Sequence, residues 1–577
     1  MSLPRLDAVP STAHGSREWS DAGAVRDACV WAVLSALVLG LAPIGVVSGD
    51  GLAQSLSYTL GTWRWNPNHL LLEPVGAWWQ GMLTHLDVPL APPDVLTRLS
   101  VVCGSLALGL FRGAVAPALT SSRWAANHAT AWLALSAGFA THWVSNEAHM
   151  IQMPFLVLSA AAVAHYAARP SWRLGLGVGA AVGLAALAFV SDALLAPALA
   201  LTIGVWHVRR REGRAAVGAA VAIGLGAVLV AGVGFLLAWA GAAPPGVGLL
   251  HWVRAYAGGG GAQRVAVEYG LSSLSGLPVA VGRAGYGAAS ALVDLAPVVE
   301  ALRDHDAARL WSVGSALRVV AFTAAVGVVV ASAAGFVRRP GDPSATAVRF
   351  IVVGWTLAVL PFDVYWNNSD LQFYFQLAVP LAALIASLAP DRLRRVGLVS
   401  ILSGGALVWD AGDLTFRQVL YPWQVRVAQL GAAIGDAGLV VYPGEDEIEQ
   451  ILFFVKAPPR AARLSITSLA EHQPARVGLE ALRTRVEHTL AAGGRVATIG
   501  IFDVPPRSNP WKFLGTLGYD LGEVRAVLER FPLDSVATHA GPFPVRVVHP
   551  AAASGVAPPL HQGVRARGDR PSRRLGQ

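Results

Sequence analysis

Two carboxylates stand in short polar stretches beside long apolar runs, where each could act on a substrate at a membrane surface. Asp50 lies in Ser48-Gly49-Asp50-Gly51, after the first apolar run, and Glu147 lies in the short stretch 141–149. A carboxylate can take the proton of an attacking hydroxyl that lies within hydrogen-bond reach. Both residues also have a structural explanation. Asp50 could cap the helix that follows it, and Glu147 could keep a short loop solvated.

The first of these loops carries further polar side chains. Asn68, His69 and Glu73 lie within residues 66–74, just before an apolar segment that contains Trp78 and Trp79. Amides, an imidazole and a carboxylate so close together favour a polar binding surface over a plain connection. His149, two residues after Glu147, is a further candidate, although a histidine there is more typical of the membrane interface than of a metal site.

Two later turns repeat the pattern. Asp192 follows Ser191 in a tight hairpin turn, where a helix-capping role is the simpler explanation and a binding role the second. Residues 361–374 contain Asp363, Asp370 and two asparagines beside Trp366. An aromatic belt explains the rings of this stretch but not its acids and amides. We therefore expect a polar pocket in which Asp363 and Trp366 take part.

Arginines near these stretches could neutralise a phosphate. Arg64 lies in the first long loop, Arg254 and Arg264 lie in the second, and Arg318 lies near one end of an apolar helix. Guanidinium groups form paired hydrogen bonds with phosphate oxygens. For Arg318, a side chain that snorkels along the helix to the interface is an equal explanation.

Arginine clusters and acids alternate from one connection to the next. The clusters are Arg112 with Arg123, Arg169 with Arg173, Arg209–Arg211 with Arg214, Arg338–Arg339 with Arg349, and Arg392 with Arg394–Arg395. Loops rich in arginine stay in the cytoplasm under the positive-inside rule. The connections that carry Asp50, Glu147, Asp192 and Asp363 therefore face outward.

The composition is that of a membrane protein. Of 577 residues 14% are charged and 54% hydrophobic, and the mean hydropathy is +0.50. A net charge of +8 would suggest nucleic acid in a soluble protein. Here the basic residues fall largely in cytoplasmic loops, so orientation and anionic lipid headgroups explain them, and no nucleic-acid partner is expected. The Arg-, Ala- and Gly-rich usage is associated with bacteria of high GC content.

We predict an α-helical polytopic membrane protein with about eleven transmembrane helices and a small C-terminal extracytoplasmic α/β domain. The crossings are expected near 29–47, 94–111, 124–142, 149–168, 173–191, 193–208, 215–240, 312–337, 348–364, 371–389 and 395–411. The domains are a cytoplasmic segment 1–27, a transmembrane domain 28–412 with long outer loops 48–93 and 241–311, an α/β domain 413–550 and a disordered tail 551–577.

Two further patterns bear on the fold. Residues 439–442, 463–468 and 495–502 read as strands, and 446–455, 477–492 and 522–531 read as helices, which together predict a largely parallel sheet. Gly175, Gly179 and Gly183 recur every four residues and predict a close-packing face between membrane helices. Because no strand precedes these glycines, a nucleotide-binding loop is rejected.

Over roughly residues 28–411 the chain resembles the GT-C superfamily of membrane glycosyltransferases, in particular bacterial mannosyl- and arabinosyltransferases. The resemblance rests on Asp50 just outside the first helix, a long first outer loop, and Glu147 between helices three and four. Residues 366–380 also look like the late helices of bacterial members, and the α/β domain is similar to one that many members carry. Some members have a paired Asp-Glu where this chain has Asp50-Gly51, which leaves the use of a divalent metal ion open.

The resemblance implies a function at the outer face of the bacterial cytoplasmic membrane. A polyprenyl-phosphate-sugar would donate its sugar, with inversion, to a hydroxyl of a lipid, glycan or protein acceptor. Asp50 would act as the general base, Asp50 and Glu147 would line one outward cavity, and an arginine or a metal would stabilise the departing phosphate. Two alternatives are a non-catalytic GT-C-like scaffold and a lipid-linked sugar transporter. The transporter is disfavoured because ionisable residues are scarce at mid-membrane depth.

Overall fold

The computed structural model describes residues 21–41, 51, 54–55, 58, 65–88, 90, 92–146, 148–243, 246–257, 276–303, 305–337, 342–365, 374–387, 423–444, 462–504, 511–534, 537–540 and 543–550. The chain forms two compact units. Unit 1 comprises Met1–Ala428 and Asp446–Phe454, and unit 2 comprises Gln429–Glu445 and Val455–Gln577.

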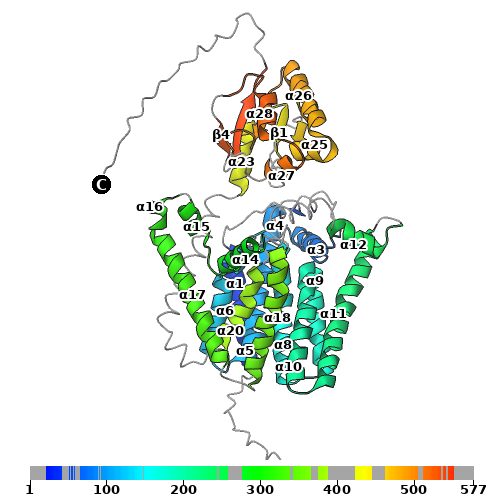
Figure 1. Ribbon diagram of the computed structural model, residues 1–577, viewed down its shortest axis with the longest axis vertical. Helices are drawn as coiled ribbons and strands as arrows, with labels where there is room; N and C mark the ends of the chain where they lie inside the picture. Colours follow the sequence, from blue (N-terminus) through cyan, green and yellow to red (C-terminus); the bar gives the residue numbers. More distant parts are fainter. Residues whose placement is uncertain are drawn as a thin grey trace, which may run out of the picture. The chain divides into compact units, whose positions relative to one another are not determined.

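Unit 1 is a bundle of apolar helices (Figure 1). In chain order these are α1 (Asp21–Leu41), α3 (Leu72–His85), α4 (Pro92–Leu110), η1 (Phe111–Val115), α5 (Ala116–Leu119), α6 (Arg123–Leu135), α7 (Ala137–Trp143), η2 (Ala148–Gln152), α8 (Met153–Ala168), α9 (Trp172–Ala188), η3 (Val190–Leu194), α10 (Leu195–Arg209), α11 (Gly213–Ala242), α12 (Leu249–Ala257), α14 (Leu277–Leu292), α15 (Ala296–Arg303), α16 (Ala307–Leu310), α17 (Val313–Val337), α18 (Pro343–Tyr365), η5 (Phe375–Leu377) and α20 (Ala378–Ala386). The η1 segment is a π-helix, whereas η2, η3 and η5 are 3₁₀-helices.

The lengths of these helices fit a multi-pass membrane protein. Within the described residues, 6 helices are long and apolar enough to cross a bilayer, and α9, α20 and the first half of α17 are shorter apolar helices. Each predicted crossing up to 371–389 overlaps one or more of these helices. The last predicted crossing, 395–411, lies outside the described residues.

Among the described residues, the connection from α8 to α9, with Arg169 and Arg173, and the connection from α10 to α11, with Arg209–Arg211, lie at one end of the bundle. Tyr166, near the end of α8, hydrogen-bonds His207 near the end of α10 across 2.9 Å. The neighbouring ring of Trp206 packs edge-on against Phe350 in the first part of α18, with centroids 5.5 Å apart. We call this end, which carries Tyr166, His207 and Arg209–Arg211, the arginine end. The opposite end, which carries His69, His149 and Asp192, we call the histidine end.

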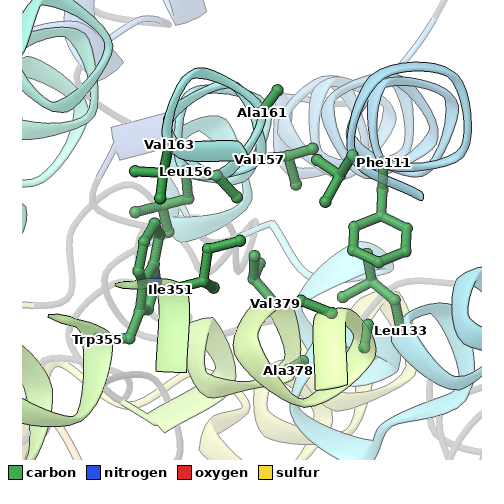
Figure 2. Close-up of a cluster of buried hydrophobic side chains, with 14 of the residues drawn as sticks. Phe111, Leu133, Leu156, Val157, Ala161, Val163, Ile351, Trp355, Ala378 and Val379 are labelled. Atoms are coloured by element: carbon green, nitrogen blue, oxygen red, sulfur yellow. The ribbon is translucent and has the colours of Figure 1, made fainter. Parts of the chain in front are cut away.

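Part of the buried core of unit 1 lies where η1, α6, α8, α18 and α20 meet. Figure 2 shows Phe111 of η1 and Leu133 of α6 facing the α8 side chains Leu156 and Val157, with Ile351 and Trp355 of α18 and Val379 of α20 closing the cluster. All of these side chains are buried. Alanines such as Ala161 and Ala378 let the helices approach closely around the larger rings, as is usual in membrane bundles.

The glycine repeat packs α9 against α11, which confirms that pattern. A Cβ atom on Gly179 would collide with the carbonyl oxygen of Ile223, and one on Gly226 would collide with that of Leu176. At Gly183 the approach is looser, since a Cβ atom there would lie 2.9 Å from the Cβ atom of Val230. The backbones of the two helices therefore meet directly along this face.

Unit 2 is a small α/β domain. Its five-stranded sheet has the order β2-β1-β3-β5-β4. The elements are α23 (Trp423–Ile434), which crosses the boundary between the units, β1 (Leu439–Tyr442), β2 (Ala462–Ser465), α25 (Ile466–His472), α26 (Ala475–Ala491), β3 (Val496–Ile499), α27 (Trp511–Thr516), α28 (Leu521–Leu528), β4 (Thr538–Ala540) and β5 (Phe543–Val548). The strands β2, β1 and β3 are parallel, as predicted, whereas β5 and β4 add an antiparallel hairpin that the sequence analysis missed.

Two predicted strands were too long. Residues 495–502 were expected to be extended, but β3 ends at Ile499. Residues 463–468 were expected to be extended, but the strand ends at Ser465, whose hydroxyl accepts a hydrogen bond from the backbone N–H of Ser468 and so caps α25. The predicted helix 446–455 lies outside the described residues. The helices predicted at 477–492 and 522–531 correspond to α26 and α28.

Candidate functional site

Several predicted site residues lie outside the described part of the chain. These are Asp50, Arg64, Glu147, Arg264 and Trp366, together with the side chain of Arg254, whose backbone lies in α12. The expectation that Asp50 and Glu147 line one cavity therefore stays a prediction. The described candidates are Asn68, His69, Glu73, His149, Asp192, Arg318 and Asp363.

Aromatic rings from three connections between helices meet at the histidine end. The His69 ring stacks on Phe189 with centroids 4.9 Å apart and an angle of 21° between the planes. His149 packs edge-on against both, at 5.6 Å from His69 and 5.1 Å from Phe189. The backbone reinforces this arrangement, because the N–H of Val190 donates to the carbonyl oxygen of Asn68 at 3.0 Å. Of the predicted residues, the structure thus brings Asn68, His69 and His149 together.

A third histidine, which the sequence analysis did not select, extends the group. His142 lies at the end of α7, and its ring is 5.9 Å from that of His149 and 4.8 Å from that of Phe375 in η5. Both His142 and His149 are buried. We refer to His69, His142, His149, Phe189 and Phe375 as the histidine cluster. It joins the first outer loop, the α7–η2 connection, the α9–η3 turn and η5 at one place.

Asp192 is the most unusual carboxylate among the described residues. Its side chain is 1% exposed, and neither carboxylate oxygen has a hydrogen-bond partner in the described structure. A capping role is therefore wrong, because a cap accepts a backbone N–H. Its backbone N–H donates to the carbonyl oxygen of Phe189, which places Asp192 one short turn beyond the histidine cluster.

Gln152 has the same character. It is 1% exposed, and both its amide oxygen and its amide nitrogen lack partners among the described residues. Residues three apart share a face of a 3₁₀-helix, so Gln152 lies on the face of η2 that His149 presents to Phe189. A buried polar group without a partner is costly.

The end of α18 adds a second buried carboxylate. Asp363 is fully buried in the last turn of α18. Gly354 of α18 packs on Leu199 of α10, and the two helices run in opposite directions, since α10 ends and α18 begins at the arginine end. Seven residues toward the histidine end lead from Leu199 to Asp192, in η3 just before α10, and from Gly354 to Pro361 in α18. Because α18 also packs against η3, Asp192 and Asp363 lie at a similar level.

Helix α14 covers this region from the second long loop. A Cβ atom on Gly287 would collide with the ring of Tyr374, and one on Gly138 of α7 would meet Phe375 and the carbonyl oxygen of Ala291. Helix α14 therefore packs between α7 and η5, with Ala280 and Ala284 also buried. This part of the second loop is thus part of the bundle at the histidine end.

Two other predicted site residues, Glu73 and Arg318, are buried within unit 1. Glu73 is buried in the first turn of α3 beside Tyr58. Burial, and then the negative charge and hydrogen bonding of Glu73, raise the pKa of Tyr58, whose hydroxyl also donates to the carbonyl oxygen of Leu72 at 3.2 Å. Arg318 is only 4% exposed in α17. Its side chain is therefore packed within unit 1, and the snorkelling explanation is wrong.

No group of three or more metal-binding side chains occurs in the part of the chain that the structure describes. The histidine rings contact one another through their edges and faces, with Phe189 and Phe375 between them.

Comparisons with known proteins returned only structural similarities: no family model and no curated protein sequence matched. A structure of ArnT from Cupriavidus metallidurans bound to undecaprenyl phosphate is 13% identical over 90% of this chain and 97% of that chain, with a TM-score of 0.48. The oligosaccharyltransferase AglB from Archaeoglobus fulgidus, in complex with an inhibitory peptide and a dolichol-phosphate, is 11% identical over 94% of this chain and 75% of that chain, with a TM-score of 0.47. At these scores the function has to be argued from the residues of this chain.

Proposed function

We propose that this protein is a glycosyltransferase of the bacterial cytoplasmic membrane. It transfers a sugar from a polyprenyl-phosphate donor to an acceptor hydroxyl on the extracytoplasmic side, with inversion at the anomeric carbon. The observation that carries the proposal is the convergence at the histidine end. His69, His142, His149, Asp192 and Phe375 come from the first long loop, the α7–η2 connection, η3 and η5, and all of them except the half-buried His69 are buried.

Asp50 acts as the general base in this proposal. Its carboxylate takes the proton of the acceptor hydroxyl while the hydroxyl oxygen bonds to the anomeric carbon. The bond from that carbon to the phosphate oxygen breaks, and its electron pair leaves with the polyprenyl phosphate. A base near its ordinary pKa is ionised at neutral pH and suits this task. Glu147 is the second acid of the same site.

The charge that develops on the departing phosphate needs donors that are already in place. The N–H groups of His69, His142 and His149 can donate to phosphate oxygens, and Arg64, Arg254, Arg264 and Arg318 are the candidate cations. Asp192, Asp363 and Gln152 lie at the same end of the bundle and can hydrogen-bond sugar hydroxyls. Such bonds would satisfy the Asp192 and Gln152 atoms that lack partners among the described residues.

The two alternatives differ from this proposal in specific ways. A transporter would carry its ionisable residues near mid-membrane, whereas the buried carboxylates Asp192 and Asp363 lie at one end. A scaffold that keeps the fold without catalysis would tolerate the loss of Asp50. An Asp50 variant therefore distinguishes the two: an enzyme loses sugar transfer when Asp50 is replaced, whereas a scaffold keeps its function.

The test is glycolipid and glycan profiling of a deletion strain complemented with wild type, Asp50→Asn or Asp306→Asn. Asp306 is a matched control from the second long loop, because its side chain caps α16 by accepting from the N–H of Arg309 at 3.0 Å and Asn caps equally well. We expect Asp50→Asn to lower transfer by about 10²–10⁴-fold, with normal amounts of folded protein in the membrane, and Asp306→Asn to behave as wild type. Near-normal product from Asp50→Asn would remove Asp50 as the base.

A further inference from the structure

A lipid-facing groove runs along α1. It is lined by Val30, Trp31, Leu34, Ser35, Val38 and Leu39 of α1 and by Trp143 of α7, and its volume is about 340 Å³. An apolar cavity of about 150 Å³ is enough to hold benzene. The groove along α1 is more than twice that size, so it has room for a length of hydrocarbon chain.

The lining offers no polar group to an occupant. The indole N–H of Trp31 donates to the Asn127 side chain at 3.3 Å, and that of Trp143 donates to the carbonyl oxygen of Val101 at 3.0 Å. The hydroxyl of Ser35 donates back to its own helix at 2.6 Å. An occupant that makes no hydrogen bonds along its length, such as an acyl or isoprenoid chain, fits these walls.

The packing of α1 explains why the groove opens where it does. Near the arginine end, α1 touches α4 and η1 closely, because Ala28 packs on Gly109 and Gly113 and Asp27 pairs with Arg112 at 2.6 Å. Farther along, the ring of Trp143 rests on Gly104 of α4. The bulk of this ring forms the second wall of the groove.

The groove leads to the candidate site. Trp143 directly follows His142 of the histidine cluster, and Asn146, three residues later, fills the space beside Gly51, where a Cβ atom would collide with it. Gly51 is the sequence neighbour of Asp50, the proposed base. One short segment, Trp143–Asn146, therefore forms a wall of the groove and also contacts the residue next to the base that would act on the acceptor.

We infer that the acceptor is itself a membrane lipid, and that one of its hydrocarbon chains lies in the groove along α1 while its hydroxyl headgroup reaches the base. This inference rests on the proposed function and adds the chemical class of the acceptor. A chain held beside α1 fixes the depth of the headgroup. The binding energy of the non-reacting tail then positions the reacting hydroxyl.

Photocrosslinking from inside the groove tests the occupant. Benzoylphenylalanine replaces Leu34, which lines the groove, or Val33, which does not; the two positions are matched at 57% and 55% exposed. After irradiation in native membranes, mass spectrometry identifies the adducts. We expect Leu34 adducts enriched several-fold in one class of acyl lipid, and Val33 adducts that follow the bulk lipid composition. Equal adducts at both positions, a polyprenyl adduct at Leu34, or a crosslink to residues 395–411 of this chain would each overturn the inference.

A second experiment measures the effect on transfer. Leu34→Trp fills the groove, and Val33→Trp adds the same side chain elsewhere on α1. In the complemented deletion strain we expect Leu34→Trp to lower the amount of glycolipid product at least tenfold and Val33→Trp to leave it unchanged. Equal effects of the two variants, or a product that carries no lipid, would refute a lipid acceptor. If wild type restores no glycolipid or glycan at all, the proposed function fails, whereas the crosslinks still report what lies in the groove.

Discussion

His69 stacks on Phe189 with ring centroids 4.9 Å apart, although the two residues belong to the first outer loop and to the turn after α9. The contact pins the first loop to the α9–η3 turn, and the hydrogen bond from the N–H of Leu71 to the carbonyl oxygen of Leu187 at 2.9 Å holds the same two segments. The loop that carries Asn68 and His69 is therefore a fixed part of the bundle.

The first prediction concerns the partnerless carboxylate. Asp192→Leu should lower sugar transfer at least tenfold and at the same time raise the unfolding temperature in detergent, because a buried carboxylate without a described partner destabilises the folded state. Asp27→Leu serves as a contrast, since it removes the partner of the buried Arg112 and should lower stability by about 3–5 kcal/mol. If Asp192→Leu unfolds more readily than wild type, Asp192 has a structural partner and the ligand-binding role falls.

The second prediction concerns the α9–α11 contact. Gly179→Ala should destabilise unit 1 by about 1–3 kcal/mol, because the added methyl group meets the carbonyl oxygen of Ile223. Gly177→Ala is the matched control in the same helix, since nothing lies within 4 Å of its Cβ position. The free energy of unfolding of both variants is measured by denaturation in mixed micelles. Similar behaviour of the two variants would contradict direct backbone packing at Gly179.

The third prediction concerns orientation. Reporter fusions after Arg211, Arg339 and Arg395 should report the cytoplasm, and fusions after Asp50, Asp363 and Asp446 should report the outside, as the distribution of arginines requires. A cytoplasmic signal from the Asp446 fusion would reject an odd number of crossings, and with it the extracytoplasmic placement of unit 2.

The fourth prediction concerns unit 2. Asp503 has a positive φ of 59° and forms a two-pronged ion pair with Arg546 at 2.7 and 2.8 Å. Asp503→Asn should cost about 1 kcal/mol, because the pair is lost from a partly exposed position while the left-handed backbone is still tolerated. Asp503→Ala should cost about 1–2 kcal/mol more, since alanine also strains that backbone. Thermal unfolding of the full chain is followed by circular dichroism. The unfolding temperature should be highest for wild type, lower for Asp503→Asn and lowest for Asp503→Ala. Equal stability of the two variants would show that the backbone conformation carries no cost.

Features that depend on a regular residue spacing or on the sign of the charge in a connection could be predicted from the sequence. The four-residue spacing of Gly175, Gly179 and Gly183 predicts a helix contact because it marks one face whatever the partner is. The alternating arginines predict which connections share an end, and the contact of Trp206 with Phe350 agrees with that grouping. The parallel strands β1 and β3 were also visible as short runs of buried residues.

Features that depend on tertiary contacts were missed. His142 looked like an ordinary residue at a helix end, and only the meeting of α7 with η2 and η5 makes it part of the histidine cluster. Gln152 carries no local signal at all. The burial of α14 was hidden because a helix rich in Gly and Ala within a long loop does not reveal its neighbours. Arg112 was assigned to a cytoplasmic loop, whereas it is fully buried and paired with Asp27.

That pairing depends on the π-helix η1. A π turn contains one residue more than an α turn, and η1 places this extra residue within the continuous helical run from α4 to α5, where Arg112 meets Asp27 and Asn127. Loss of one residue from 111–115 would restore α geometry and leave the two flanks close to their present orientation, because the π turn accommodates its extra residue locally, but it would remove the bulge from which Arg112 reaches Asp27. Insertions and deletions in this stretch should therefore covary with charge: a homologue that is one residue shorter here should also lack the acid at position 27.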